Sequence, residues 1–318
     1  MGEIMKALVT GGNGFIGSHL VDSLLASGWD VTVLDLTHRR FDPVPDGVNF
    51  VQGDFSTEYL LRECVADSDV VFHLAWAGIH ELSNGDPIAD ITTNLVCSVR
   101  LLEICCAEKV GRVVFLSSGG TVYGTPKKLP IPLDHPLEPI TSYGITKLAV
   151  EKYLKMYFHL HGLEYAILRP SVPFGPRQNP LAHQGAPAVF LYRVAYGLPI
   201  TIWGDGETTR DFFYIEDLVR AMLAAASSPL VTYRTFNIGG KEAVSLNQLL
   251  YEIEVIVGKK AVVNYADARI FDATHIKLDT HITEEYLQWN SQVPLSEGLS
   301  RTWDWMKKNI SKPDTSGI

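Results

Sequence analysis

The sequence predicts an α/β fold, a doubly wound parallel sheet with a smaller, discontinuous C-terminal domain. Three observations lead to this prediction. Short apolar runs alternate with helical patterns as far as Pro170, a glycine-rich turn joins the first run to the first helical pattern, and prolines become frequent after Pro170. At 318 residues, 46% of them hydrophobic, the chain is long enough for about two domains.

The first strand–helix–strand unit opens the chain. It consists of an apolar run at 4–9, a helical pattern from Ile16 to about Gly28, and a second apolar run at 31–34 that ends at Asp35. Continuous apolar runs closed by glycine or polar residues are typical of parallel strands buried on both faces. This unit predicts the first two strands of a parallel sheet.

The same alternation continues beyond this unit. We expect further strands at 48–51, 69–74, 112–117, 166–169 and 235–238, and helices at 90–109, 142–161, 215–226 and 245–257. Residues 172–211 are rich in proline and glycine, and we interpret them as a loop-rich insertion. We therefore expect one domain from residues 1–171 plus 212–241, a second from 172–211 plus 242–311, and a polar tail at 312–318.

Composition excludes several classes of protein. With 27 Lys and Arg against 36 Asp and Glu, the net charge is −9, and no long basic run is present, so we expect neither nucleic acid nor membrane as a partner. No run approaches the about 18 apolar residues of a membrane span. The histidines and the four cysteines lack metal-ligand spacing, so we assign no metal site and expect reduced thiols in a cytoplasmic protein.

Glycines at 11, 14 and 17 lie between the first strand and the first helix. This spacing allows a tight turn, a close approach of the backbone to a pyrophosphate, and close packing of the helix on the sheet. The helix N-terminus then presents its N–H groups to the phosphates. In this context the motif predicts a Rossmann-type dinucleotide site.

Asp35 ends the second strand, where a carboxylate accepts both hydroxyls of the adenosine ribose and repels a 2′-phosphate. The cofactor we expect is therefore NAD. Arg39 and Arg40 leave an alternative open, since they would reach a 2′-phosphate if their loop folded back.

Two further segments border the expected cofactor. Asp54 follows the third strand and would lie near the adenine amino group. The fourth strand ends in His73, Leu74, Ala75 and Trp76, with small and apolar groups suited to lie under the cofactor. For Trp76, ordinary core packing is an equal alternative.

Tyr143 and Lys147 lie four residues apart near the start of a predicted helix, and hence on one face. The ammonium of Lys147 would lower the pKa of the Tyr143 phenol, and an oxidised nicotinamide would add a second positive charge. Such a tyrosine can take the proton from a sugar hydroxyl while hydride leaves the same carbon. The alternative is an amphipathic helix with an aromatic residue near its start.

A turn rich in hydroxyl groups, residues 117–124, precedes this helix. One of its hydroxyls would share a hydrogen bond with the substrate and relay a proton. A serine and threonine turn that caps its own backbone is the equal alternative.

Together these motifs resemble the extended short-chain dehydrogenase/reductase superfamily, and in particular nucleotide-sugar epimerases of the UDP-glucose 4-epimerase type. The resemblance runs from Lys6 to about Lys308. It rests on Thr-Gly-Gly-x-Gly-Phe-Ile-Gly at 10–17, His-Leu-Ala at 73–75, Ser-Ser-x-x-x-Val-Tyr-Gly at 117–124, Tyr-Gly-x-x-Lys at 143–147, Leu-Arg-Pro at 168–170, Phe-Gly-Pro-Arg-Gln at 174–178, Gly-Asp-Gly at 204–206, Arg-Asp-Phe at 210–212, Asn-Ile-Gly at 237–239, and Arg-x-x-Asp at 269–272.

The resemblance implies roles for individual residues. Tyr143 would be the acid/base and Lys147 its partner, while Arg210 and Arg269 would hold a nucleotide diphosphate and Asp272 would contact the nucleotide ribose or buttress Arg269. The implied NAD shell contains Gly11, Gly14, Phe15, Ile16, Gly17, Asp35, Asp54, Phe55, Leu74, Ala75, Trp76, Asn94, Lys147 and Pro170.

The chain departs from the family pattern at two positions. The usual catalytic Ser or Thr aligns with Gly119, so the relay would fall to Ser118 or Thr121, or Tyr143 would act directly. An Asn that commonly contacts the substrate phosphate aligns with Val172. The turn also lacks the acid that family dehydratases carry, which favours epimerisation.

The resemblance therefore implies an NAD-dependent 4-epimerase of a UDP-hexose. Two alternatives remain: a nucleotide-sugar dehydratase or reductase, and a non-catalytic NAD-binding regulator. By resemblance we also expect a homodimer that pairs helices near 92–108 and 142–161.

Overall fold

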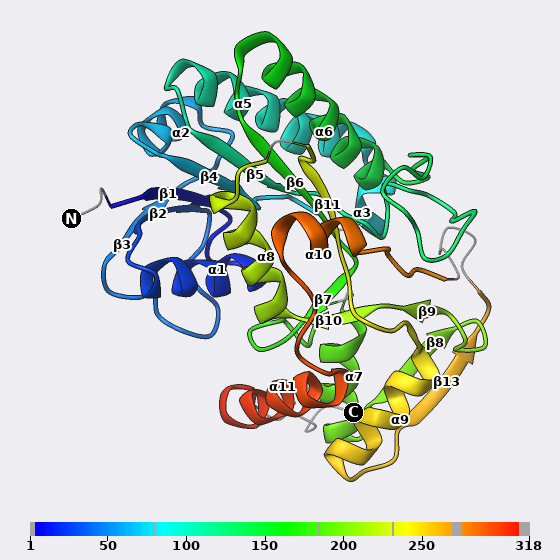
Figure 1. Cartoon of the computed structure of the whole chain (residues 1–318). Helices are drawn as coiled ribbons and strands as arrows, with labels where there is room; N and C mark the ends of the chain where they lie inside the picture. The colour runs from blue at the N-terminus through cyan, green and yellow to red at the C-terminus, as the bar shows by residue number, and fades with distance from the viewer. Residues whose placement is uncertain (1–3, 79, 183–184, 231, 269–274, 312–318) are drawn as a thin grey trace.

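A seven-stranded parallel sheet forms the centre of the computed structural model, which describes residues 4–78, 80–182, 185–230, 232–268 and 275–311 (Figure 1). The strand order is β11-β6-β5-β4-β1-β2-β3. The strands are β1 (Lys6–Thr10), β2 (Asp30–Asp35), β3 (Val48–Gln52), β4 (Val70–His73), β5 (Arg112–Leu116), β6 (Tyr165–Pro170) and β11 (Thr235–Ile238). This sheet confirms the predicted doubly wound fold.

The strand order reverses at β1, which pairs with β2 on one side and with β4 on the other. In open α/β sheets, ligands bind beyond the carboxyl ends of the strands at such a reversal. The glycine-rich turn follows β1 and the His73–Trp76 segment follows β4, so both predicted cofactor segments lie at the reversal.

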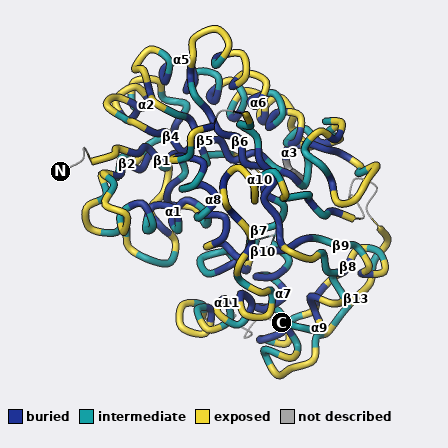
Figure 2. The backbone as a smooth tube through the Cα atoms, in the orientation of Figure 1, coloured by how far each residue is buried: buried dark blue, intermediate teal, exposed yellow. Residues whose placement is uncertain are grey.

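Side chains of each strand alternate between two cores. Ala7 and Val9 of β1 belong to one buried cluster and Leu8 to the other. The first cluster includes residues of α1 (Phe15–Ala26) and α8 (Ile215–Ser227), and the second includes residues of α2 (Glu58–Val65), α5 (Cys97–Ala107) and α6 (Ser142–His161). Figure 2 shows the sheet buried between these two helical layers.

The helix expected at 90–109 has a different course. It begins as α4 (Pro87–Asp90), because Asp86 accepts a hydrogen bond from the Ala89 N–H at 3.0 Å and Pro87 fits the first turn. It then widens into a π-helical segment η1 (Ile91–Val96) before α5. The widened segment carries Asn94.

The expectation of a loop-rich insertion at 172–211 is wrong. The segment contains β7 (Val172–Phe174), α7 (Ala186–Tyr196), β8 (Pro199–Trp203) and β9 (Thr209–Arg210). Pro187 lies in the first turn of α7, where a proline costs no hydrogen bond, so it opens the helix instead of breaking it. Helices α2 and α3 (His80–Gly85) were also not expected from the sequence.

Three small two-stranded sheets lie below the central sheet in Figure 1. They pair β7 with β10 (Phe212–Tyr214), β9 with β12 (Val244–Ser245), and β8 with β13 (Val262–Ala266). They are accompanied by α7, α9 (Leu246–Val257) and α11 (Leu295–Asn309), whereas α10 (His281–Leu287) packs against β11 and α8. Within the described ranges, no helix combines the length and the apolar character needed to cross a membrane.

Candidate active site

The glycine-rich turn is shaped by two close backbone contacts. Gly11 has φ +73°, and a Cβ there would lie 2.8 Å from the Ala75 nitrogen. A Cβ on Gly17 would lie 2.2 Å from the Gly11 oxygen. Only glycine fits at these two positions.

Gly14 is different, because a Cβ there would meet only the Gly11 oxygen, at 3.4 Å. Packing within the protein does not require this glycine, so its missing side chain keeps the outer side of the turn open. Gly14 is also the N-cap of α1, and no side chain caps the helix there. The start of α1 at Phe15 and Ile16 is thus left without a side-chain cap, and its N–H groups fit the pyrophosphate of a dinucleotide.

Asp35 lies beside this turn at the end of β2. Its carboxylate accepts the N–H of Asn13 at 3.0 Å and the N–H of Thr37 at 3.1 Å. The half-buried carboxylate is thereby fixed next to the turn, as contact with an adenosine ribose requires.

Arg39 is held by groups of α1. Its guanidinium donates to the Ser18 carbonyl at 3.1 Å and pairs with Asp22 at 2.9 Å, with only 3% of the side chain exposed. Arg39 is therefore committed to α1, and Asp35 with its negative charge decides in favour of NAD. Arg40 is exposed, with its guanidinium over the Phe41 ring.

The segment after β4 is held by hydrogen bonds on both sides. The Ala75 N–H donates to the Thr10 hydroxyl at 3.2 Å. The Asn94 side chain accepts from the Ala77 N–H at 2.7 Å and donates to the Ala77 carbonyl at 2.9 Å and to Asp90 at 2.8 Å. Asn94 is fully buried, and its side chain fixes the position of this segment through Ala77.

His73 links the same segment to η1 and α5. One ring nitrogen is hydrogen-bonded to the Thr10 hydroxyl at 2.9 Å and the other to the Ser98 hydroxyl at 2.8 Å, and Ser98 donates to the Asn94 carbonyl at 2.6 Å. Burial lowers the pKa of His73 to about 3, so the ring is neutral.

Three other predicted cofactor residues take separate places. Asp54 is exposed and accepts the Ser56 N–H at 2.8 Å, whereas Phe55 is buried with its ring 5.7 Å from that of His73. Pro170 is buried at the end of β6 and accepts the Gly119 N–H at 2.8 Å.

Helix α6 presents Tyr143 and Lys147 from a well-capped start. Thr141 accepts the Gly144 N–H at 3.2 Å. The side chains of Asn84 and Ser83 on α3 accept the N–H groups of Ser142, at 2.9 Å, and Tyr143, at 3.2 Å. Sequence reasoning missed α3, whose only signal is a run of polar residues with no apolar period.

The Lys147 ammonium lies in a buried position. It donates to the Leu116 carbonyl at 2.8 Å and lies 3.6 Å from the centre of the Trp76 ring and 5.7 Å from that of Tyr143. Burial lowers the pKa of Lys147, and the carboxylates of Asp90 and Glu151 oppose this shift.

The pKa of Tyr143 is raised to about 12, chiefly by burial and further by Asp90, so Lys147 alone does not produce the expected lowering. The nearby Ser118 side chain acts in the other direction and lowers the pKa. The Thr121 hydroxyl is buried and has no hydrogen-bond partner in the described structure. Of the two candidate relay residues, Ser118 is therefore the one whose side chain acts on the pKa of Tyr143.

Gly119 cannot carry the usual hydroxyl side chain here. A Cβ at this position would lie 2.5 Å from Leu278 Cδ1 and 2.8 Å from the Arg169 carbonyl oxygen. The departure from the family pattern is thus matched by packing against the segment that contains Leu278.

A buried ion pair between Arg169 and Glu151 holds the hydroxyl-rich turn at residues 117–124. Arg169 donates to both carboxylate oxygens of Glu151, at 2.9 and 2.6 Å, and Ser117 donates to the same carboxylate at 2.6 Å. Arg169 also donates to the Tyr123 hydroxyl at 2.8 Å, which donates to Asn237 at 2.7 Å. The pair ties α6 to β6 and to the hydroxyl-rich turn.

The predicted substrate residues are only partly described. Arg210 lies on β9 and donates to the Thr209 carbonyl at 2.8 Å, and Val172 on β7 pairs in register with Phe212. Arg269 and Asp272 lie outside the described residues, as does the predicted tail at 312–318.

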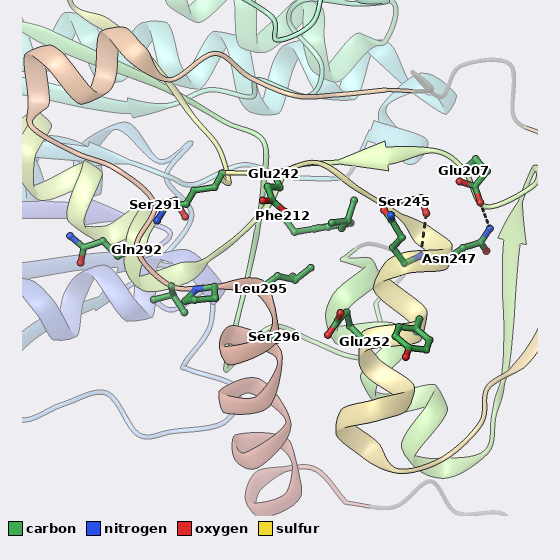
Figure 3. A pocket seen from close by; sticks show the side chains of 16 residues that line it. Glu207, Phe212, Glu242, Ser245, Asn247, Glu252, Ser291, Gln292, Leu295 and Ser296 are labelled. Atoms are coloured by element: carbon green, nitrogen blue, oxygen red, sulfur yellow. Dashed lines mark hydrogen bonds between the residues drawn. The ribbon is translucent and has the colours of Figure 1, made fainter.

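A separate cavity of about 650 Å³ lies between α9 and the start of α11 (Figure 3). None of its lining residues is a predicted site residue, and several of its polar groups are used by the fold. Ser245 and Gln248 cap α9, and Asn247 donates to Glu207 at 2.6 Å. We assign it no ligand.

The chain belongs to the NAD dependent epimerase/dehydratase family, whose model matches residues 7–239. A putative UDP-glucose 4-epimerase from Methanocaldococcus jannaschii is 36% identical over 95% of this chain and 98% of its own length. The parallel sheet, the glycine-rich turn after β1 and the position of Asp35 are those expected of such an enzyme.

Two solved structures have nearly the same fold as this chain. A UDP-glucose 4-epimerase from Thermotoga maritima, solved with UDP-glucose, has a TM-score of 0.91 and 35% identity over 96% of this chain and 99% of that chain. A Thermus thermophilus UDP-glucose 4-epimerase in complex with NAD has a TM-score of 0.88 and 33% identity over 95% and 99%.

Proposed function

We propose that this chain is an NAD-dependent 4-epimerase of a UDP-hexose. The observation that carries the proposal is the juxtaposition of Ser118, Tyr143 and Lys147. The three side chains meet beyond the carboxyl ends of β4 and β5, near the turn that fits a dinucleotide. The relatives named above carry the same activity in their names.

The chain's own groups would hold the cofactor and move one proton. NAD, when bound, supplies the hydride acceptor for C4 of the sugar. The start of α1 would receive the pyrophosphate, Asp35 the adenosine ribose and Lys147 the nicotinamide ribose. Tyr143 would take the proton of the 4-hydroxyl and later return it, with Ser118 as the hydroxyl between them.

The substrate side would be formed by residues 172–211 and 242–311, which we propose as the substrate domain. Arg210 and Arg269 would hold the diphosphate through charge-assisted hydrogen bonds, and Asp272 would contact the nucleotide ribose or support Arg269. Val172 would offer the substrate phosphate only apolar contact, where the family pattern commonly has an Asn.

Epimerisation is favoured over dehydration by the hydroxyl-rich turn. Gly119, Gly120 and Thr121 supply no carboxyl group beside Tyr143. A dehydratase has to move a second proton, and this turn offers no acid for that step.

We also propose a homodimer. Helices α4 to α5 expose Ile88, Ile91 and Val96, and α6 exposes Ile145, Met156 and Leu160. Apolar side chains on neighbouring helices form a surface suited to pair with a second copy across a two-fold axis.

The experiment is a set of incubations with UDP-glucose, UDP-galactose and their N-acetyl and uronate forms in the presence of NAD. We expect one pair to equilibrate without added reductant and without net formation of NADH. Tyr143→Phe should lower this activity by at least about 10³-fold while NAD stays bound. Steady NADH formation or a stable 4-keto product would indicate the dehydratase or reductase, and indifference to Tyr143→Phe the regulator.

A further inference from the structure

The backbone on either side of Trp76 is fixed. Ala75 is anchored to Thr10 at 3.2 Å, and Ala77 is anchored to Asn94 through both its N–H and its carbonyl, at 2.7 and 2.9 Å. Trp76 stands between these anchors, so the direction of its side chain is set by the ends of β1 and β4 and by η1.

The face of the indole ring lies against the Lys147 ammonium. The Nζ atom is 3.6 Å from the centre of the Trp76 ring, but 4.9 Å from that of Phe115. The Lys147 residue is only 3% exposed, and its one described hydrogen bond goes to the Leu116 carbonyl. Since a cation is attracted to the face of an aromatic ring within about 6 Å, Trp76 supplies the closest aromatic contact for this buried charge.

The ring also touches the catalytic tyrosine. Trp76 and Tyr143 meet edge to face, with ring centres 5.9 Å apart and an angle of 75°. The indole N–H is buried and has no hydrogen-bond partner in the described structure, so the ring is held by its faces and edges and not by its polar group.

Four titratable or charged groups surround Lys147 within the described structure. Asp90 on α4 is buried and accepts from Ser142, Thr146 and Asn94. Glu151 is paired with Arg169, His73 is neutral, and Tyr143 carries its proton. The two carboxylates favour the ammonium, and Trp76 provides its closest ring contact.

We propose that Trp76 is a positioning residue, which holds the Lys147 ammonium by the face of its indole ring in the place from which Lys147 acts on Tyr143. The assignment rests on the proposed function. It gives Trp76 a role exerted through Lys147, in addition to the cofactor contact expected from the sequence.

The test compares Trp76→Phe, which keeps an aromatic face but removes the N–H, with Trp76→Leu, which removes the face. Phe115→Leu is the control for repacking beside Lys147. Two quantities are measured on the NAD-loaded chain: the pH dependence of kcat, and the apparent pKa of Tyr143 from tyrosinate absorbance, read as the difference from a matched Tyr143→Phe chain.

We expect Trp76→Leu to move the alkaline limb of kcat down by about one pH unit and to raise the apparent pKa of Tyr143, because the ammonium is less stable. Trp76→Phe and Phe115→Leu should shift both by a few tenths at most. Equal shifts in both Trp76 variants, or no shift in Trp76→Leu, would overturn the proposal. If the wild-type chain epimerises no sugar, the proposed function fails, and the absorbance titration still decides the role of Trp76.

Discussion

Ser118 lies close enough to the Tyr143 phenol for its side chain to lower the pKa of that phenol, although the two residues come from different elements. Ser118 lies in the turn after β5, and Tyr143 lies in the first turn of α6. The Ser118 side chain thus opposes the rise in the pKa of Tyr143 that burial causes. It is for this reason that we propose Ser118 as the relay residue, a position that the sequence left open between Ser118 and Thr121.

Ser118→Ala should lower kcat by about 10²-fold, as loss of a positioned proton-transfer group does. The apparent pKa of Tyr143 should rise at the same time. Thr121→Ala is the matched control, since its hydroxyl has no described partner, and its effect on kcat should be much smaller. A larger loss in Thr121→Ala than in Ser118→Ala would reverse the assignment.

Gly119→Ser should destabilise the fold by about 1–3 kcal/mol, as overpacking does, because its Cβ would meet Leu278 and the Arg169 carbonyl. Urea unfolding measures the change. Gly120→Ser is the control, since a Cβ at Gly120 meets nothing within 4 Å and should change stability by no more than about 0.5 kcal/mol. Equal effects at both positions would contradict the packing explanation.

His73 makes stability depend on pH. Because its pKa is lowered from 6.5 to about 3, the unfolded chain binds a proton below pH 6.5 that the folded chain does not. The stability it contributes is present above pH 6.5 and is lost as the pH falls, by about 1.4 kcal/mol per pH unit. In His73→Gln, which cannot titrate, the difference in unfolding free energy from wild type should shrink between pH 6.5 and 4.5; a constant difference would argue against the shift.

Glu151→Gln should destabilise the chain by about 3–5 kcal/mol, since it leaves the buried Arg169 without its counter-charge. The double replacement by methionine at both positions should recover part of the loss. Glu58→Gln breaks an exposed pair with Arg62, one helical turn away, and should cost no more than about 1 kcal/mol. Denaturant unfolding of the three variants gives the comparison.

The fold could be predicted where one signal dominated. The helix at 142–161 and the strand at 235–238 have the bounds expected from their apolar patterns. In α7 the signals conflicted, because the prolines that end regular structure also begin helices. The position of Pro187 relative to Gly197, which closes α7 in a left-handed conformation, decides between the two.

The residues of the site could be named from their motifs, but their contacts could not. Whether Ser118 or Thr121 meets Tyr143 depends on how the turn folds over three residues, and spacing does not report that. Likewise, Arg39 is directed to α1 by Asp22, a residue with no motif of its own. Long-range partners of this kind become visible only when the elements are assembled.

The hydrogen bonds of Asp90 join the segment after β4 to the first turn of α6, through Asn94 on one side and Ser142 on the other. The part of the site that carries the proposed acid/base group Tyr143, formed by this segment and this helical turn, is therefore rigid. A 4-epimerase has to present both faces of one 4-keto sugar ring to the same hydride carrier. Because this part of the site does not move, we expect the sugar to rotate about its diphosphate, which Arg210 would hold. The rotational freedom of the bound sugar should then limit the rate of inversion at C4.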